Sequence, residues 1–296
     1  MTQTIVEADN VFDMRVCQLG EGPLWHPLQQ RWYWFDILQK RLLAKDTQGD
    51  YSWQFDEMVS AAGWVDKSHL LIASETGLYS FDTRSPHGCN RQSATKRLLV
   101  ELESNNPLTR SNDGRADPWG GFWIGTMGKQ AQRGLGSIYR FYLGELRLVV
   151  SGMTITNAIC FAPDKTCVYY TDTPSQKIMR QSLDSQGWPI GEACVWVDLR
   201  PKGLNPDGAV VDSKGNLWNA QWGASQVACY NPVGELIKRV RFPAKQISCP
   251  AFGGINMDVL LATSASVDAD QEDTNAGMTF TISLDATGLA DYRVEL

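Results

Sequence analysis

Four residues able to bind a metal ion stand at the same offset in four separate parts of the chain. They are Glu21, Asn112, Asn157 and Asp207, and the residues 11 positions after them are Trp32, Trp123, Val168 and Trp218. Two carboxylates and two carboxamide oxygens, completed by water, are ligands that suit a hard divalent cation. Two carboxylates held together without a cation would repel, and one of them would tend to stay protonated. The pattern therefore predicts a metal site, provided that the fold brings the four residues together.

The shortage of histidine narrows the chemistry. The chain has three histidines, His26, His69 and His87, which argues against a histidine-based metal site and against a mechanism with two histidines. Any bound metal would need mostly oxygen ligands. The sequence also lacks a GxSxG nucleophile elbow, and GLGS at 134–137 does not follow a strand and open a helix as a dinucleotide loop would. We interpret His26, in the first predicted hairpin, as a structural residue.

Each polar residue also has a simpler interpretation when it is taken alone. The segments 206–208 (PDG) and 112–114 (NDG) are common turn sequences, and Glu21 could be a solvated charge. The offset shared by four segments favours a joint functional role. Arg110 places a guanidinium beside the same site, and its planar set of donors suits carboxylate or hydroxyl-rich ligands.

Short β-rich runs, rather than helices, must position these residues. Runs such as RWYWFDI, GFWIGT and NLWNAQW alternate with turn segments such as APDKT and DSKGN, and no long segment has apolar residues at helical spacing. Related units begin near residues 21, 60, 112, 157, 207 and 249, at intervals of 39 to 52 residues. Such intervals are typical of a four-stranded blade. The sequence predicts an all-β fold, a six-bladed β-propeller with four-stranded blades around a central channel, as a single domain over residues 1–296.

An irregular β-sandwich with chance similarity between its hairpins is the alternative fold. A sandwich would not need the same order of turn, strand and loop six times, so the propeller is favoured. We expect the ring to close by pairing an N-terminal strand around residues 11–18 with the last blade near 278–284. Such closure would protect the ring from opening.

In a propeller, the residues at the shared offset lie where each innermost strand begins, facing the channel. Residues from different blades then converge at one face, with Ser60 and Cys249 in this position in the other two units. The second strand of each unit returns to the same face, so the residues four positions beyond the 11-residue offset should surround the same opening. These are Asp36, Glu75, Met127, Asp172, Trp222 and Ser264. Such a mixture would suit a sugar-like ligand, and Trp222 is the tryptophan that we expect in the pocket.

Composition sets limits on partners and compartment. The 296 residues carry a net charge of −6 with a pI of about 5.2, and no Lys/Arg cluster offers a footprint for nucleic acid. No apolar run approaches the roughly 18 residues that span a bilayer, and MTQTIVEADN lacks the pattern of a secretion signal. The seven cysteines form no CxxC. We expect reduced thiols in a cytoplasmic protein that binds a small molecule, although Cys160 and Cys167 could face each other across a hairpin; the oligomeric state is left open.

At these residues the sequence resembles the gluconolactonase/regucalcin-like (senescence marker protein) family of sugar lactonases. The matching segments are GEGPLWHP (20–27), YWFDI (33–37), RSNDGRADPWGGFWIGTM (110–127), NAICFAPDKTCVYYTDT (157–173), NPDGAVVDSKGNLWNAQWG (205–223) and SCPAFGG (248–254). The resemblance implies a six-bladed propeller with one divalent cation in its channel. Family members often have Asn-Gly at the third motif, where this chain has Asn157 and Ala158. This alanine either narrows the channel floor or changes nothing.

The resemblance also implies roles for individual residues. Those that match the metal ligands are Glu21, Asn157 and Asp207. Those that match the substrate-binding pair are Arg110 and Asn112, to which we add Asp113 and Trp222. Ca²⁺ is the expected cation, and Zn²⁺, Mg²⁺, Mn²⁺ and Fe²⁺ can also use oxygen ligands.

The expected activity is therefore hydrolysis of an aldono-1,4- or 1,5-lactone to the aldonic acid, a carboxylic-ester hydrolase reaction. Asp207 is the candidate base, and Arg110 and Asn112 would hold the sugar lactone. A non-enzymatic calcium-binding or ligand-sensing propeller is the first alternative, but it would need neither Arg110 nor a polar opening. A propeller that hydrolyses organophosphates or aryl esters is the second, and it would prefer a more apolar opening with histidine near the metal.

Overall fold

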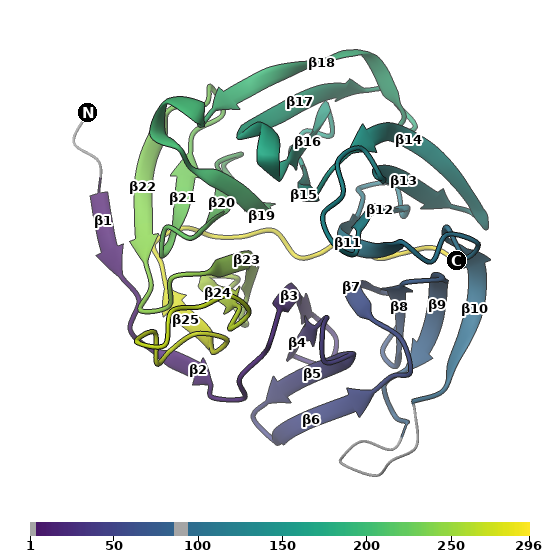
Figure 1. Ribbon diagram of the computed structural model, residues 1–296, viewed down its shortest axis with the longest axis horizontal. Coiled ribbons are helices and arrows are strands. Elements are labelled where there is room, and N and C mark those ends of the chain that lie inside the picture. Colours follow the sequence, from purple (N-terminus) through teal and green to yellow (C-terminus); the bar gives the residue numbers. More distant parts are fainter. Residues whose placement is uncertain (1–3, 86–93) are drawn as a thin grey trace.

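Six β-sheets surround a central axis in the computed structural model, which describes residues 4–85 and 94–296 (Figure 1). From the innermost strand outward, blades I to III are β3–β6 (Gly20–His26, Arg31–Asp36, Arg41–Asp46, Gly49–Gln54), β7–β10 (Val59–Trp64, His69–Ser74, Gly77–Asp82, Lys96–Glu101) and β11–β14 (Thr109–Ala116, Phe122–Gly128, Gly136–Tyr142, Glu145–Met153). Blades IV to VI are β15–β18 (Thr156–Phe161, Cys167–Asp172, Lys177–Leu183, Pro189–Asp198), β19–β22 (Asn205–Val211, Leu217–Trp222, Gln226–Tyr230, Leu236–Arg241) and β23–β25 (Ile247–Gly253, Val259–Ser264, Thr279–Ser283) with β2 (Val11–Asp13). The predicted six-bladed all-β propeller is confirmed.

Apolar side chains pack between neighbouring blades rather than on the axis. Between blades I and II, Phe35 and Leu42 pack with Ile72 and Phe81, and all four are fully buried. Strands inside a blade are covered on both faces, which explains why β4 reads as a nearly continuous apolar run. Outer strands such as β14 keep exposed positions. The axis is thereby left to polar side chains from the innermost strands.

Trp123 and Trp218, which stand 11 positions after Asn112 and Asp207, lie on the second strands of their blades, β12 and β20. Each donates its indole N–H to an aspartate in the preceding turn, Trp123 to Asp117 at 3.1 Å and Trp218 to Asp212 at 3.0 Å. Both aspartates also accept two backbone N–H groups of their own turns. The same turn structure is thus built in both blades, which keeps the offset of 11 residues constant between them.

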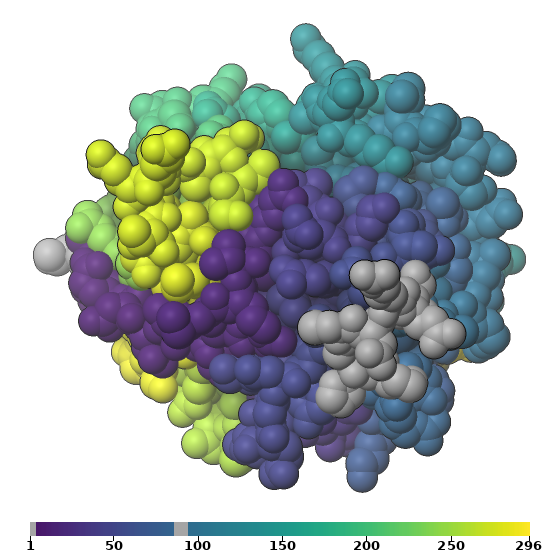
Figure 2. Space-filling model, turned by 60° about the horizontal axis from the view of Figure 1, so that its bottom comes forward, coloured from purple at the N-terminus to yellow at the C-terminus, as the bar shows by residue number. Residues whose placement is uncertain are grey.

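The ring closes through the N-terminal segment, as predicted. Strand β2 pairs antiparallel with β25, with Val11 opposite Phe280, and purple N-terminal residues lie against yellow residues of the last blade in Figure 2. The pairing is shorter than the expected 11–18, because Asp13 turns the chain by accepting hydrogen bonds from the backbone and guanidinium of Arg15. Strand β1 (Thr4–Glu7) was not anticipated; it adds a parallel fifth strand outside β22.

Each innermost strand is interrupted close to its beginning. The register with the second strand shifts at Glu21/Leu24, Val59/Ala61, Ser111/Gly114, Asn157/Cys160, Pro206/Ala209 and Ile247/Pro250. A β-bulge bends a strand and redirects its side chains. All six bulges fall at the positions that carry the offset residues, so the bulges turn these residues toward the channel.

The C-terminal segment, residues 284–296, crosses the other end of the ring, where the innermost strands finish. The yellow trace runs past the centre in Figure 1. Its backbone N–H groups bond to Met257 O (from Gly288, 2.7 Å), Trp64 O (from Val294, 2.9 Å) and Gly120 O (from Glu295, 2.8 Å). This segment therefore covers the channel at the end opposite the offset residues.

Helix is confined to the short 3-10 turns η1 (Thr173–Ser175) and η2 (Arg200–Lys202) in the described residues, and neither is long enough to cross a membrane. The six cysteines within 4–85 and 94–296 are free thiols, so Cys160 and Cys167 do not pair. Cys89 and His87 lie outside the described residues.

Candidate functional site

A cavity of about 290 Å³ opens where the innermost strands begin. Twelve residues line it: Leu19, Glu21, Arg110, Asn112, Met127, Ile155, Asn157, Thr173, Asp207, Trp222, Val267 and Asp268. The structure thus brings together six of the seven residues that the sequence proposed for metal and substrate. The seventh, Asp113, is absent from this lining; its buried carboxylate accepts the Ile159 N–H at 2.8 Å.

The bulges explain how four blades deliver side chains to one cavity. Glu21 precedes Gly22, which has φ +54°, and Asn157 precedes Ala158, which has φ +58°. A Cβ on Gly22 would lie 2.3 Å from Ser60 O, so glycine is required there by close packing as well as by conformation. Ala158 adopts the same left-handed conformation with a side chain and is not among the residues that line the cavity.

A chain of hydrogen bonds joins polar residues of two neighbouring blades, III and IV. Arg110 Nη1 donates to Asn112 Oδ1 at 2.8 Å, and Asn112 Nδ2 donates to Asn157 Oδ1 at 3.1 Å and to Thr156 O at 2.9 Å. Asn157 Nδ2 in turn donates to Thr173 Oγ1 at 3.0 Å. Both carboxamides are therefore held in one orientation, and each carboxamide oxygen keeps a second lone pair for a ligand.

Two of the three carboxylates that line the cavity, those of Glu21 and Asp207, are buried with little compensating charge. Burial, together with the nearby charge of Asp113, raises the pKa of Glu21 to about 8. Burial and the charge of Glu21 raise the pKa of Asp207 well above its usual value. Arg110 is the nearby cation, and burial lowers its pKa to about 10. The site therefore favours additional positive charge.

The donor set is one of oxygen atoms. Within residues 4–85 and 94–296, no three His, Cys, Asp or Glu side chains are grouped as a metal site. The candidate site instead combines the carboxylates of Glu21 and Asp207 with the carboxamide oxygen of Asn157. Such a set fits a hard divalent cation and does not fit a soft one.

Six residues at the ends of the second strands were predicted to surround the opening, and the prediction is correct for two of them. Met127 and Trp222 line the cavity. Asp36 instead accepts the N–H groups of Gln18 and Leu19, and Asp172 accepts those of Thr154 and Ile155.

These aspartates are wrong as pocket residues because the chain just before β3 and β15 has unpaired N–H groups that they satisfy. The remaining two positions also make other contacts. Glu75 pairs with Lys129 at 3.1 Å, and the Ser264 hydroxyl donates to Met278 O.

Several lining residues were missed by the sequence reasoning. They are Leu19, Ile155, Thr173, Val267 and Asp268. Leu19 and Ile155 could have been found, because each stands two positions before an offset residue, Glu21 or Asn157. Val267 and Asp268 lie in the loop after β24, which has no counterpart of similar sequence in the other blades, so no repeat signal marks them.

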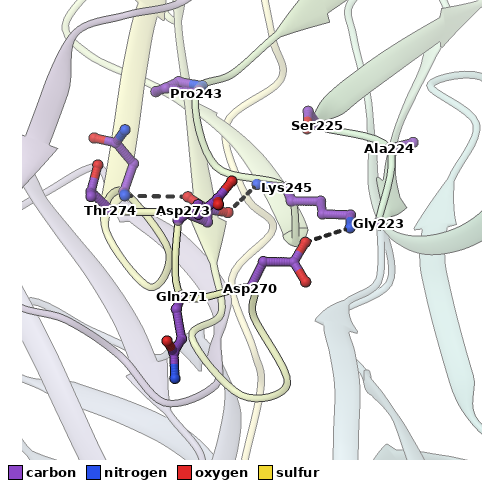
Figure 3. Close-up of a pocket in the computed structure, with 11 residues that line it drawn as sticks. Gly223, Ala224, Ser225, Pro243, Lys245, Asp270, Gln271, Asp273 and Thr274 are labelled. Atoms are coloured by element: carbon purple, nitrogen blue, oxygen red, sulfur yellow. Dashed lines mark hydrogen bonds and ion pairs between the residues drawn. The ribbon is translucent and has the colours of Figure 1, made fainter.

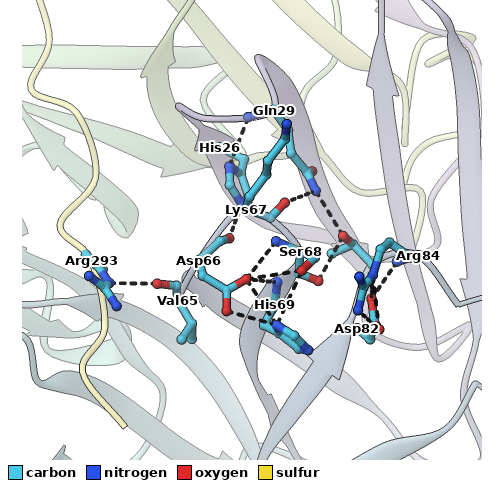
Figure 4. A network of polar contacts seen from close by, with 11 residues as sticks. His26, Gln29, Val65, Asp66, Lys67, Ser68, His69, Asp82, Arg84 and Arg293 are labelled. Carbon is cyan, nitrogen blue, oxygen red and sulfur yellow. Dashed lines mark hydrogen bonds and ion pairs between the residues drawn. The ribbon is translucent and has the colours of Figure 1, made fainter.

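A larger hollow of about 790 Å³ lies beside the loop after β24 (Figure 3). Its lysine and two of its carboxylates already bond to each other, since Lys245 Nζ bonds to Asp270 at 2.8 Å and the Lys245 N–H bonds to Asp273 at 2.7 Å. It contains none of the residues that the sequence proposed. The smaller cavity is therefore the candidate site. His26 lies elsewhere again, at the other end of β3 from Glu21, with Nε2 3.0 Å from Asp66 O (Figure 4).

Comparison with known proteins identifies the family. The model of the SMP-30/gluconolactonase/LRE-like region matches residues 19–266. A Rhizobium meliloti protein with the provisional name sugar lactone lactonase is 36% identical over 97% of this chain and 97% of its own. The L-arabinolactonase of Azospirillum brasilense is 34% identical over 93% of this chain and 91% of its own. The crystal structure of a calcium-binding protein, regucalcin, from Agrobacterium tumefaciens is 35% identical, with a TM-score of 0.94 over 100% of both chains.

The match of the family model covers more than half of the sequence, and these relatives cover nearly all of it. The chain belongs to the SMP-30/gluconolactonase/LRE-like family.

Proposed function

We propose that this protein hydrolyses a sugar 1,4- or 1,5-lactone to the open-chain aldonic acid in a metal-dependent reaction. The observation that carries the proposal is the meeting of two buried carboxylates, two oriented carboxamides and Arg110 in one cavity. The cavity, about 290 Å³, is at the lower end of the range for small-molecule sites, as suits a single sugar ring. The lactonases among its relatives support the same substrate class.

The residues present fit a divalent cation, and we assign Glu21, Asn157 and Asp207 as its ligands. A positive charge there would offset the burial and repulsion that raise the pKa of both carboxyl groups. When bound, the cation would supply Lewis-acid polarisation of the lactone carbonyl. Ca²⁺ is our first choice because the ligands are all oxygen atoms and because a structural relative is a calcium-binding protein.

Asp207 is the proposed general base. Among the described residues no side chain donates a hydrogen bond to its carboxylate; the backbone N–H of Gly208 does, which leaves lone pairs on the carboxylate for a proton. Asp207 would take a proton from water while the water oxygen attacks the lactone carbonyl carbon. The ring C–O bond then breaks, and the proton passes to the departing ring oxygen, which becomes a hydroxyl group of the aldonic acid.

Arg110 and Asn112 are proposed to hold the substrate. In the described residues, the hydrogen bonds of Arg110 come from Nη1 alone, to Ser111 O and Asn112 Oδ1. The other guanidinium N–H groups are left for the carbonyl or hydroxyl oxygens of a lactone. Trp222, at the opening, offers an apolar surface for the face of a sugar ring.

A pH-indicator assay with a panel of lactones tests the proposal. The protein is first treated with chelator, and Ca²⁺, Zn²⁺, Mg²⁺, Mn²⁺ or Fe²⁺ is then restored separately. We expect acid release with at least one sugar lactone and strong dependence on the restored metal. Metal binding without acid release from any lactone would instead favour the calcium-binding or ligand-sensing alternative. Acid release that survives chelation would contradict the metal requirement.

A further inference from the structure

Arg115 lies near the far end of β11 and joins three of the innermost strands. Its Nε donates to Ile159 O at 3.3 Å, and its Nη2 donates to Ala209 O at 3.2 Å. Ile159 belongs to β15 and Ala209 to β19. One side chain therefore links β11, β15 and β19 across the channel, below the cavity.

These strands are the ones that carry three of the site residues. Asn112 is three positions before Arg115, Asn157 is two before Ile159, and Asp207 is two before Ala209. In each strand, the site residue and the residue that carries or contacts Arg115 lie within the bulge or directly beside it. A shift of any of the three strands along the channel would therefore move a proposed ligand or substrate contact.

The guanidinium is held from below by the C-terminal segment. Arg115 Nη1 pairs with Asp291 Oδ1 at 2.9 Å, and the side chains are 11% and 9% exposed. Burial raises the pKa of Asp291, while the charge of Arg115 opposes this increase. Because removal of one partner would leave the other as an uncompensated buried charge, Asp291 fixes the position of the guanidinium.

The segment around Asp291 is itself firmly docked. The Asp291 carbonyl accepts the Trp64 indole N–H at 2.7 Å, and Arg293 Nε donates to Val65 O at 2.7 Å (Figure 4). Val294 is fully buried, and a Cβ on Gly63 would lie 2.5 Å from its side chain. The C-terminal segment thus connects Arg115 to blade II as well.

We propose that Arg115 is a positioning residue for the site, and that Asp291 of the C-terminal segment holds it in place. This inference rests on the proposed function for its catalytic readout. Arg115 is not among the residues that line the cavity. It acts by keeping Asn112, Asn157 and Asp207 at matching heights, so that the proposed cation and the lactone meet the geometry that the mechanism needs.

The test uses the full-length variants Arg115→Lys and Asp291→Asn, with Arg115→Met as the more severe change. We expect the first two to fold, with kcat reduced about tenfold, KM nearly unchanged, and affinity for Ca²⁺ by titration calorimetry about tenfold weaker. Hydrogen exchange should rise in the peptides covering β15 and β19. Arg115→Lys keeps the charge, so it should recover part of the activity that Arg115→Met loses.

Arg140 provides the matched control. It is a fully buried arginine that also pairs with an aspartate, Asp117, at 2.6 Å, but these contacts stay within the β11–β12 and β17–β18 turns. Arg140→Lys and Asp117→Asn should lower the melting temperature at least as much as the Arg115 and Asp291 variants do. Their kcat, Ca²⁺ affinity and exchange at β15 and β19 should match the parent.

Two results would overturn the inference. One is parental kcat and Ca²⁺ affinity in folded Arg115→Lys and Asp291→Asn, measured well below their melting temperatures. The other is exchange at β15 and β19 that is no faster than in the Arg140 controls. If the parent protein hydrolyses no lactone and binds no Ca²⁺, the proposed function fails, and the exchange comparison alone then decides whether Arg115 positions these strands.

Discussion

Asp207 shows how much a single side chain can be inferred from its position in a repeat. Its type, its offset from Trp218 and the neighbouring glycine are all visible in the sequence. The bonds around it are not: the sequence does not show that Asn112 would bond to Asn157, or that Asp113, one residue further along, would turn to the Ile159 N–H. Those contacts depend on the bulges, which set the direction of each side chain.

Asp207→Asn should abolish most of the turnover while leaving the fold intact. The amide cannot accept a proton from water, so we expect kcat to fall about 100-fold or more. The melting temperature without metal should not fall, because the amide is uncharged and escapes the cost of burying a carboxylate next to Glu21. Ser264→Ala is the control, since the Ser264 hydroxyl bonds to Met278 O outside the cavity. Near-parental kcat in Asp207→Asn with metal bound would refute the role of base.

Glu21→Gln should remove most of the stabilisation that a metal gives. Ca²⁺ at 100 times its dissociation constant adds about 2.7 kcal/mol, or roughly 5 °C in a protein of this size. The parent should show this increase by calorimetry, and Glu21→Gln should show little of it. Glu57→Gln, at a glutamate that pairs with Lys96 away from the cavity, should keep the full increase. An equal increase in Glu21→Gln would exclude Glu21 as a ligand.

At the scale of the strand, the repeat predicted the order of elements but not their irregularities. The offset of 11 residues held because turns such as that of Asp117 are built alike. The same periodicity misled at Asp36 and Asp172, since a position in the repeat does not reveal which unpaired N–H groups lie nearby. Strand β1 gave no signal because its pairing is parallel and at an outer edge.

Ala158 tests the energetic cost of one bulge. Its φ of +58° costs a non-glycine residue about 1–2 kcal/mol. Ala158→Gly relieves this cost but gives up a buried methyl group, about 0.8 kcal/mol, and adds about 0.5–1 kcal/mol of chain entropy.

We therefore expect Ala158→Gly to leave the free energy of unfolding nearly unchanged. Ala228→Gly, at a buried position in the middle of β21, lacks the relief and should lose about 1.5 kcal/mol. Urea denaturation measures both variants. Equal losses would show that the bulge stores no strain at Ala158.

At the scale of the whole molecule, the ring and its closure were predictable because blades repeat and because a ring needs a partner for its last sheet. The C-terminal crossing was not predictable. Residues 284–296 follow no repeat, and their binding depends on single contacts such as Asp291 with Arg115. Arg115 itself was invisible as a functional candidate, since it acts through the carbonyl groups of distant strands.

Two truncations separate the contributions of the N-terminal strands. Removal of residues 1–7 deletes β1, which covers only the outside of β22, and we expect a modest loss of stability. Removal of residues 1–14 also deletes β2, exposes the edge of β25 and removes Phe12 from Trp34. This should cost at least about 2 kcal/mol more in urea denaturation and promote association detected by light scattering. Equal stability of the two truncations would show that β2 does not close the ring.

The crossing of residues 284–296 also makes the two ends of the channel different. Arg115, Asp291 and the crossing segment cover the far end of the channel, so the cavity is reached from the opposite end. A product formed in the cavity must leave through the same opening by which its substrate entered. In the proposed reaction, the departing acid and the arriving lactone therefore use the same opening. Aldonic acid should then inhibit turnover competitively, raising the apparent KM without changing the maximal rate.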